Sequence, residues 1–322
     1  MWLRVACVSM AQFPSPSHVQ QILLTASTLD EPVLDVSGCN LNGDSAAFVL
    51  ADTILANRFF SFVQMNFDRT AVSPRAFDSI VSAASENRNL IVFSARDNNL
   101  PSEAGFAISR LLLSSGNLSA LDLASNALGD EGVAAIAGAF ASNFVDVPSS
   151  TTARFSIFSL RVIDLSSNSV TDMGVLALCK GLQQIVRDSR LVGRSVSLRA
   201  LRLDANKIGD KGALSLSQIL ALQDDDSFAL QELSLNDNFI SSQGLRAILT
   251  GSSSRPLVLL RMSRNLCDLH VLDKLAALCA CGQAPQALEL HFDERSSSAL
   301  LGITAWSSIF TLHITQLNIY DV

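Results

Sequence analysis

The chain is poor in basic and aromatic side chains. Its 322 residues include 23 Lys and Arg against 30 Asp and Glu, which gives a net charge of -7, and only one Tyr and two Trp. Basic surfaces with interleaved aromatic residues are typical of nucleic-acid-binding proteins. Because the sequence has neither feature, we expect no sequence-specific binding of nucleic acid.

Long apolar segments are also absent. No run of 18 or more apolar residues without a charge occurs, whereas a helix that crosses a bilayer needs about 20 such residues. We therefore expect no membrane partner. The first 29 residues contain Arg4 and His18 but no acidic residue, which is compatible either with a mitochondrial presequence or with an ordinary first repeat.

The residue patterns of common catalytic and metal sites are missing. The six Cys form no C-x-x-C pair, the four His share no metal-ligand spacing with Cys or carboxylates, and neither a Gly-rich phosphate loop nor a G-x-S-x-G motif occurs. We expect no enzyme, no cofactor and no metal. We further expect reduced cysteines and an intracellular, cytoplasmic protein, with a cilium or a mitochondrion as other compartments compatible with the sequence.

A short pattern recurs along the chain and is clearest in residues 198–216. Apolar residues occupy positions 0, 3, 5 and 10 of the pattern, and Asn206 occupies position 8. The alternation Leu201-Arg202-Leu203 predicts a strand with both Leu on one face, and the spacing after Gly212 predicts a helix. One such unit cannot bury its apolar side alone, so copies of it must stack.

Copies of the pattern cover most of the sequence. Tight copies begin at Leu118, Leu160, Leu198 and Leu230, and looser copies contain Leu34, Leu90 and Leu257. Degenerate copies are expected at Val63-Met65-Asp68, Leu288-Leu290-Asp293 and Leu312-Ile314.

These residues resemble the leucine-rich repeat pattern L-x-x-L-x-L-x-x-N/C-x-L. The long unit with a Gly-initiated helix is similar to the ribonuclease-inhibitor class, which Ran GTPase activators and NOD-like receptors share. The resemblance implies an α/β solenoid, a curved horseshoe of about ten repeats with a parallel inner sheet and outer helices. We expect a single domain, 1–322, with an N-terminal capping unit at 1–30 and degenerate C-terminal capping repeats at 285–322.

Insertions enlarge three consecutive repeats. The units that begin at Leu118, Leu160 and Leu198 span 42, 38 and 32 residues, which exceeds the basic 28 by 14, 10 and 4. We place the insertions at 141–158, 183–197 and 223–228, each between the end of a helix and the next strand. They are then either tolerated surface loops or a partner-contacting rim on one edge of the solenoid.

The repeated asparagine has a structural interpretation. A buried Asn at the corner after each strand can satisfy backbone groups of the neighbouring turns. We expect this structural ladder to consist of Asn98, Asn126, Asn168, Asn206, Asn238 and Asn265.

Charged residues gather at strand positions that point away from the core, toward the expected concave face. Acidic residues prevail early in this row and Arg appears late, which suits a polar protein partner through charge complementarity, although a merely solvated sheet would show the same residues. The candidate partner-binding residues are Asp122, Asp164, Arg202, Asp204, Asn236, Asp237, Arg261 and Arg264.

The sequence thus favours a non-catalytic scaffold that binds a protein partner through the concave face or the insertion rim. Proteins similar to this class occur as fixed subunits of ciliary, cytoskeletal and ribosomal assemblies, so such a subunit is expected by analogy. The alternative is a GTPase-activating protein for a Ran-like small GTPase. A third option, an inhibitor of a secreted ribonuclease, predicts a Trp-rich inner face, but the only Trp are Trp2 and Trp306.

Overall fold

A computed structural model describes residues 33–41, 44–56, 62–141, 159–191, 193–223, 227–267, 281, 285–292 and 316–321. The expected capping unit 1–30 lies outside the described residues. So do residues 142–158 of the insertion 141–158. The chain divides into two compact units, Met1–Asp164 and Leu165–Val322. Both are built from the same alternation of a short strand and a helix.

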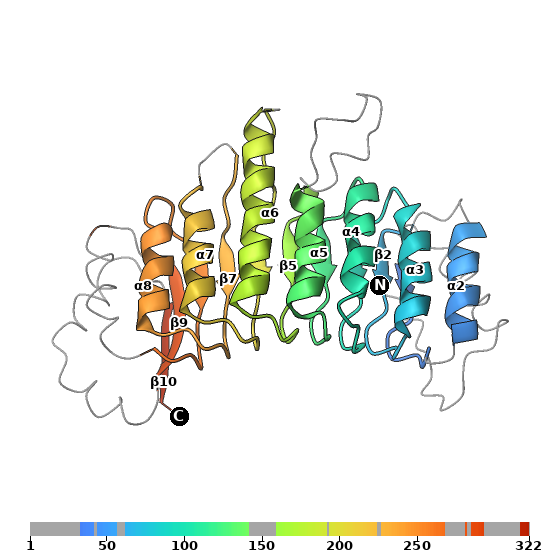
Figure 1. Cartoon of the computed structure of the whole chain (residues 1–322), viewed down its shortest axis with the longest axis horizontal. Coiled ribbons are helices and arrows are strands. Elements are labelled where there is room, and N and C mark those ends of the chain that lie inside the picture. The colour runs from blue at the N-terminus through green and yellow to red at the C-terminus, as the bar shows by residue number, and fades with distance from the viewer. Residues whose placement is uncertain are drawn as a thin grey trace. The chain divides into compact units, whose positions relative to one another are not determined.

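Strands and helices alternate strictly in the first unit. Its strands are β1 (Val33–Asp35), β2 (Gln64–Asn66), β3 (Val92–Ser94), β4 (Ala120–Asp122) and β5 (Val162–Asp164). Its helices are α2 (Asp44–Ala56), α3 (Pro74–Ser85), α4 (Ala104–Ser114) and α5 (Gly129–Ala141). The strands pair in parallel in chain order, and the four helices lie side by side along them (Figure 1).

The second unit repeats this arrangement. Its helices are α6 (Asp172–Leu191), α7 (Asp210–Leu220) and α8 (Ser242–Gly251). Its strands are β6 (Ala200–Arg202), β7 (Glu232–Ser234), β8 (Leu259–Arg261), β9 (Ala287–Phe292) and β10 (Gln316–Asp321), again parallel and in chain order. The predicted α/β solenoid with parallel strands and covering helices is therefore confirmed in both units.

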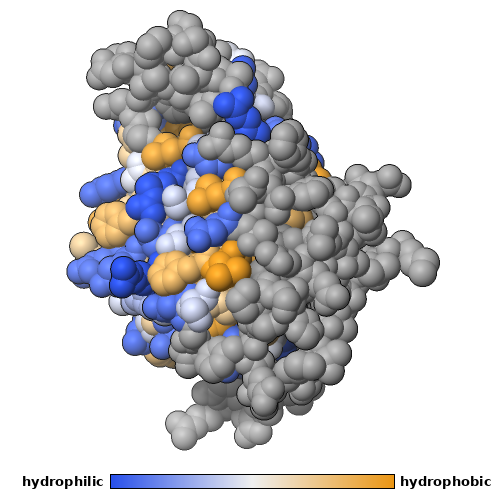
Figure 2. All heavy atoms as spheres, turned by 90° about the vertical axis from the view of Figure 1, so that its right-hand side faces the viewer, coloured by the Kyte–Doolittle hydropathy of each residue, from blue (hydrophilic) through white to orange (hydrophobic). Residues whose placement is uncertain are grey.

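The core consists of the apolar positions of the repeat. Leu118, Leu121, Leu123 and Leu128 of one repeat are each at most 1% exposed, and the equivalent residues of the other tight copies are buried as well. Figure 2 views the chain from the side that lies on the right in Figure 1. Among the described atoms of this view, hydrophilic and apolar residues are interspersed. Burial thus separates the core positions from a mixed surface, as the periodicity predicted.

The register of the second repeat differs from the prediction. Met65 of β2 lies opposite Leu34 and Phe93, so Val63-Met65-Asp68 was placed two residues too early. The true copy has Phe62, Met65, Phe67 and Val72 at the apolar positions, all buried, and Thr70 at the Asn position. The prediction failed because Phe and Met stand where the other copies have aliphatic residues, and because the Asn is missing.

The last predicted copy is also wrong in register. In β10 it is Leu317, not Leu312, that lies opposite Leu288 of β9. Asn318 therefore pairs with Glu289. Without an Asn to mark the corner, apolar alternation alone did not distinguish between the two alignments.

The insertion at 183–197 is largely helical, which corrects the expectation of a connection after the helix. Helix α6 continues to Leu191 and has 20 residues, against 11 in α7 and 10 in α8, and it is visibly longer than both in Figure 1. Its end is defined by Gly193, which has φ +64°, and by an N–H···O bond from Arg194 to Ser189 of 2.9 Å. This is the Schellman arrangement that glycine favours.

Cysteine pairing departs from the expectation at one position. Cys39 is disulfide-bonded, so the prediction of reduced cysteines is wrong for this residue. Cys179, Cys267 and Cys281 are not part of a disulfide.

Candidate functional site

The strand face is the side of the strands opposite to the one that packs on the helices. On β7, Glu232 and Ser234 flank the buried Leu233 and so point to this face. The eight predicted partner-binding residues all belong to the strands of this face or to the turns that follow them. Asp122 and Asp164 belong to the first unit, and the other six belong to the second.

A carboxylate lies between two guanidinium groups on the second unit's strand face. Glu232 Oε1 accepts hydrogen bonds from Arg202 Nε at 3.2 Å and from Arg261 Nη1 at 2.7 Å. Burial disfavours ionisation of Glu232, but the hydrogen bonds and positive charges of Arg202 and Arg261 outweigh it and lower the pKa of the carboxyl group. The side chains of Arg202 and Arg261 are nevertheless 40% and 32% exposed.

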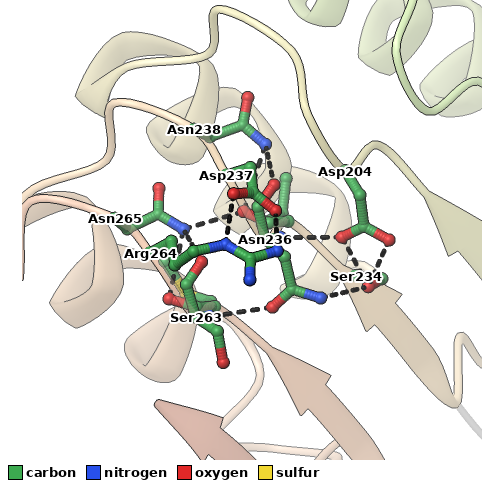
Figure 3. A network of polar contacts seen from close by, with 10 residues as sticks. Asp204, Ser234, Asn236, Asp237, Asn238, Ser263, Arg264 and Asn265 are labelled. Atoms are coloured by element: carbon green, nitrogen blue, oxygen red, sulfur yellow. Dashed lines mark hydrogen bonds and ion pairs between the residues drawn. The ribbon is translucent and has the colours of Figure 1, made fainter. Parts of the chain in front are cut away.

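Asp204 and Asn236 are hydrogen-bonded within the protein. Ser234 Oγ donates to both carboxylate oxygens of Asp204, at 2.6 and 2.8 Å, and the Asn236 N–H donates to Asp204 Oδ1 at 2.7 Å. Asn236 Oδ1 in turn accepts from the Ser263 N–H at 2.8 Å (Figure 3). Both residues therefore connect consecutive turns, and much of their hydrogen-bonding capacity is used by the fold.

Asp237 and Arg264 form an ion pair at the corner after the strands. Figure 3 shows the guanidinium group facing the carboxylate, with Nε and Nη2 on separate oxygens. The hydrogen bond and the charge of Asp237 raise the pKa of Arg264. Both residues have φ near +55°, at 55° and 53°, so the left-handed backbone at equivalent positions brings the two side chains together.

The first unit presents carboxylates on its strand face. Asp122 and Asp164 lie opposite each other in β4 and β5, and Asp164 is only 8% exposed. Burial raises the pKa of Asp122, as do the charges of Asp164 and Asp68, against the opposing effects of the Ala124 N–H and of Arg96. This face therefore holds closely spaced acidic groups, whereas the second unit pairs its acids with arginine.

Two members of these clusters were missed from the sequence. Glu232 precedes Ser234 by two residues, so the alternation of β7 already places it on the strand face. Asp68 was assigned to the Asn position by the wrong register of its repeat, whereas its carboxylate accepts hydrogen bonds from Ser94 Oγ and from the Arg96 N–H, at 2.5 and 2.8 Å. Strand alternation and a correct register were the signals that could have found them.

The six asparagines lie at the corners, and the side chains of Asn98, Asn126, Asn206, Asn238 and Asn265 bond to the backbone of an adjacent repeat. In Asn206, Nδ2 donates to the carbonyls of Leu165 and Leu203, both at 3.0 Å, and Oδ1 accepts from the N–H groups of Asn168 and Val170, also at 3.0 Å. Comparable bonds are made by Asn98, Asn126, Asn238 and Asn265, and Asn168 Nδ2 donates to the Ser166 carbonyl of its own repeat at 3.1 Å. Within each compact unit, this side-chain ladder positions the strand face by fixing one corner to the next.

Groups suited to chemistry are scarce in the described part of the chain. Among these residues, no three His, Cys, Asp or Glu side chains lie close enough together to hold a metal ion. Burial raises the pKa of the Cys179 thiol to about 12, so this cysteine is a poor nucleophile. In the same residues, no helix combines the length and the hydrophobicity that crossing a bilayer requires.

Comparison with known proteins places the repeat in a family. A family model described as leucine-rich repeat matches residues 115–137, 157–179 and 194–217. Among curated proteins, none matches the chain. Similar solved structures include the tropomodulin C-terminal domain of Caenorhabditis elegans, with 14% identity, a TM-score of 0.36 and coverage of 48% of this chain and 81% of that one.

Another similar structure is an internalin from Listeria monocytogenes, with 15% identity, a TM-score of 0.35 and coverage of 96% of this chain and 91% of that one. The matched segments in this chain each contain a strand and the start of the following helix. The three matched segments are leucine-rich repeats, and the same strand–corner–helix pattern recurs in the other described repeats of the chain.

Proposed function

We propose that the protein is a non-catalytic scaffold of the ribonuclease-inhibitor-like class that binds a protein partner through its strand face. Members of the leucine-rich repeat family generally mediate protein–protein interaction. As a scaffold of this kind, the chain would act in the cytoplasm as a fixed subunit of a large ciliary, cytoskeletal or ribosomal assembly. A protein partner requires neither a cofactor nor a metal.

The observation that carries the proposal is the Arg202–Glu232–Arg261 cluster. Its three side chains come from three consecutive strands, and none of them is needed to fill the core. Two arginines that share one carboxylate and stay partly exposed present guanidinium edges toward a bound surface. Arginine is enriched at interfaces because its planar donors can bind carboxylates with defined geometry.

The acidic row of the first unit supports a partner with charges of both signs. Asp122 and Asp164 carry closely spaced negative charge, and a positively charged side chain brought near them would relieve their repulsion. Asp204 and Asn236 are weaker candidates for direct contact, because their hydrogen bonds already connect consecutive repeats.

Affinity purification with mass spectrometry tests the proposal. The wild-type protein is compared with Arg202→Glu/Arg261→Glu and with the control Arg88→Glu/Lys211→Glu, which reverses two exposed charges away from the strand face. We expect at least one protein to be captured by the wild type and the control, and to be lost from the first variant. Circular dichroism and a melting temperature within about 4 °C of the wild type would show that both variants fold.

Two outcomes contradict the proposal. Equal capture by the strand-face variant and the wild type would place the contact elsewhere. Acceleration of GTP hydrolysis by a Ran-like GTPase at micromolar protein would favour the alternative function, a GTPase-activating protein.

A further inference from the structure

Helix α5 in the first unit is apolar on every side beyond its first turn. Residues 132–141 contain no charged or hydrogen-bonding side chain, yet Ala134, Gly138 and Ala141 are exposed on the outer side of the helix. A Cβ atom at Gly138 would have nothing within 4 Å. A helix that is apolar all round is normally buried. The outer side of α5 therefore lacks the polar side chains that a permanently solvated helix face carries.

Helix α4 adds large apolar side chains to the same surface. It lies between α3 and α5 (Figure 1), and its Phe106 and Leu113 are 61% and 41% exposed. Because seven residues separate them, the two side chains lie on one side of the helix. Arg110 lies between them along that side, but its guanidinium group pairs with Asp78 of α3, on the side away from α5.

The exposed apolar residues of the two helices form one surface, called here the α4–α5 face, which consists of Phe106, Leu113, Ala134, Gly138 and Ala141. Its large side chains form a ridge on α4, and its small residues form a flat strip on α5. Exposed apolar patches of this kind mark interaction sites. Because the chain has a net charge of -7, two copies of it meet most favourably through an uncharged surface such as this one.

The starts of α4 and α5 lie at the same height. A Cβ atom at Gly105 of α4 would overlap the backbone of Gly132 of α5, so the two glycines are in direct contact. Positions on the two helices can therefore be compared by counting from these glycines, at about 1.5 Å per residue. The count shows which parts of the ridge and of the strip lie at equal heights.

The ridge and the strip match each other under a two-fold rotation. Phe106 and Leu113 lie 1 and 8 residues beyond the glycine of α4, and Ala134 and Ala141 lie 2 and 9 residues beyond that of α5. A two-fold axis midway between the helices reverses their direction, so count 1 meets count 9 and count 8 meets count 2. Phe106 of each copy thus faces Ala141 of the other, and Leu113 faces Ala134, with both contacts formed twice.

We propose that the α4–α5 face binds a second copy of this chain in a two-fold symmetric contact with antiparallel helices. A second copy is the occupant because the face carries both the projecting and the receiving element at matching heights, whereas a different protein would need only one of them. The small residues of the strip let the large side chains of the ridge approach closely and exclude water. The inference goes beyond the scaffold function and is independent of it, because the strand face lies on the other side of the strands from the helices.

Sedimentation velocity at protein concentrations from about 1 to 200 µM tests the contact, which should be weak because each copy contributes only two helices. We expect the wild type to form a dimer and Phe106→Glu to weaken it about tenfold or more, because the carboxylate would be buried against Ala141. The matched control Leu214→Glu places the same charge at a 52% exposed apolar position of α7 and should change the dissociation constant by less than about twofold. Circular dichroism shows whether both variants fold.

A second variant tests the two-fold arrangement itself. In Phe106→Glu/Ala141→Lys, the two new charges lie about 12 Å apart along the helix axes within one copy, but they face each other across the proposed contact. We expect the double variant to form the dimer about threefold or more tightly than Phe106→Glu does.

A wild type that stays monomeric at about 200 µM overturns the inference and leaves the α4–α5 face to another occupant. A dimer that Phe106→Glu weakens no more than Leu214→Glu does overturns it as well. Failure of the double variant to recover affinity overturns the two-fold pairing. Each of these outcomes leaves the strand-face proposal standing, since that proposal is measured by the capture of a different protein.

Discussion

The carboxylate of Asp210 joins the start of α7 to the start of α8 through the backbone of Gly244. Asp210 Oδ1 accepts from the N–H groups of Ser241 and Gly244, at 2.8 and 3.1 Å. Asp172 contacts Gly209 and Gly212 in the same way, at 2.7 and 2.8 Å. An acid in the first turn of one helix therefore caps the N-terminus of the next, where the free N–H groups and the helix dipole favour a negative charge.

The first prediction concerns Gly244. A Cβ atom at this position would lie 2.5 Å from Asp210 Oδ1, 2.6 Å from Ile240 Cγ2 and 3.0 Å from Ala213 Cβ. Gly244→Ala should therefore destabilise the protein, by about 1–3 kcal/mol, although alanine is the better helix former. Urea unfolding monitored by circular dichroism measures the change in free energy.

Gly138 in α5 is the matched control, because a Cβ there would have nothing within 4 Å. Gly138→Ala should stabilise the protein by about 0.5–1 kcal/mol. If both substitutions stabilise the protein, the carboxylate contact does not set the need for glycine at position 244.

The second prediction concerns the ladder. Asn206→Ala would remove the acceptor of the buried N–H groups of Asn168 and Val170, so we expect a loss of about 2–4 kcal/mol in the free energy of unfolding. Asn206→Thr should cost less. In its own repeat, Thr70 occupies the same position and donates from Oγ1 to the Phe67 carbonyl at 3.0 Å. Equal losses for the two variants would contradict a role of the side-chain hydrogen bonds.

The fold was largely predictable because its cause is local. Leu123, Leu165, Leu203 and Leu235 recur at fixed spacing before an Asn, and their burial requires stacking. Prediction failed where the residue at the corner changes, as at Thr70. Here the backbone carbonyl of Thr70 accepts the hydrogen bond from the Leu41 N–H. In other repeats an Asn side chain accepts the equivalent hydrogen bond. Prediction also failed at the end of α6. Gly193 marks where this helix ends, but the helix was expected to end earlier because the usual repeat length was assumed.

The site was predictable as a face but not as a set of contacts. Alternation along the strands assigned Arg202 and Arg261 to the right side. It did not show that Glu232 bridges them, or that Asp204 bonds to Ser234 and the Asn236 backbone. Such contacts depend on register between strands, which one repeat's own sequence does not specify.

The third prediction concerns pH. Burial and the neighbouring charges of Asp164 and Asp68 raise the pKa of Asp122 in the folded state above 3.8, so its ionisation opposes folding at neutral pH. Asp122→Asn should raise the melting temperature by about 1–2 °C at pH 7. The gain should shrink as the pH falls through the raised pKa and vanish below about 3.8, where the carboxyl group is protonated in both states. A gain that is constant from pH 7 to pH 3 would contradict this origin.

The fourth prediction concerns Glu232, whose ionisation stabilises the folded state, whereas that of Asp122 opposes it. Burial of Glu232 opposes its charge, but Arg202 and Arg261 prevail and lower its pKa below 4.5. Its contribution to stability is therefore complete above pH 4.5 and is lost as the pH falls through the folded-state pKa. Glu232→Gln should reduce the free energy of unfolding at pH 7 by about 0.5–1 kcal/mol, since all three side chains stay partly in solvent, and by less in 1 M NaCl.

The control for this measurement is Glu86→Gln, an exposed glutamate at the C-terminal end of α3, which should change stability by less than about 0.5 kcal/mol. At a pH below the folded-state pKa of Glu232, Glu232→Gln and the wild type should unfold alike. If the variant is as stable as the wild type at pH 7 and low salt, the two arginines do not depend on Glu232 for their position. Partner capture by Glu232→Gln should then equal that of the wild type, whereas a positioned cluster predicts weaker capture.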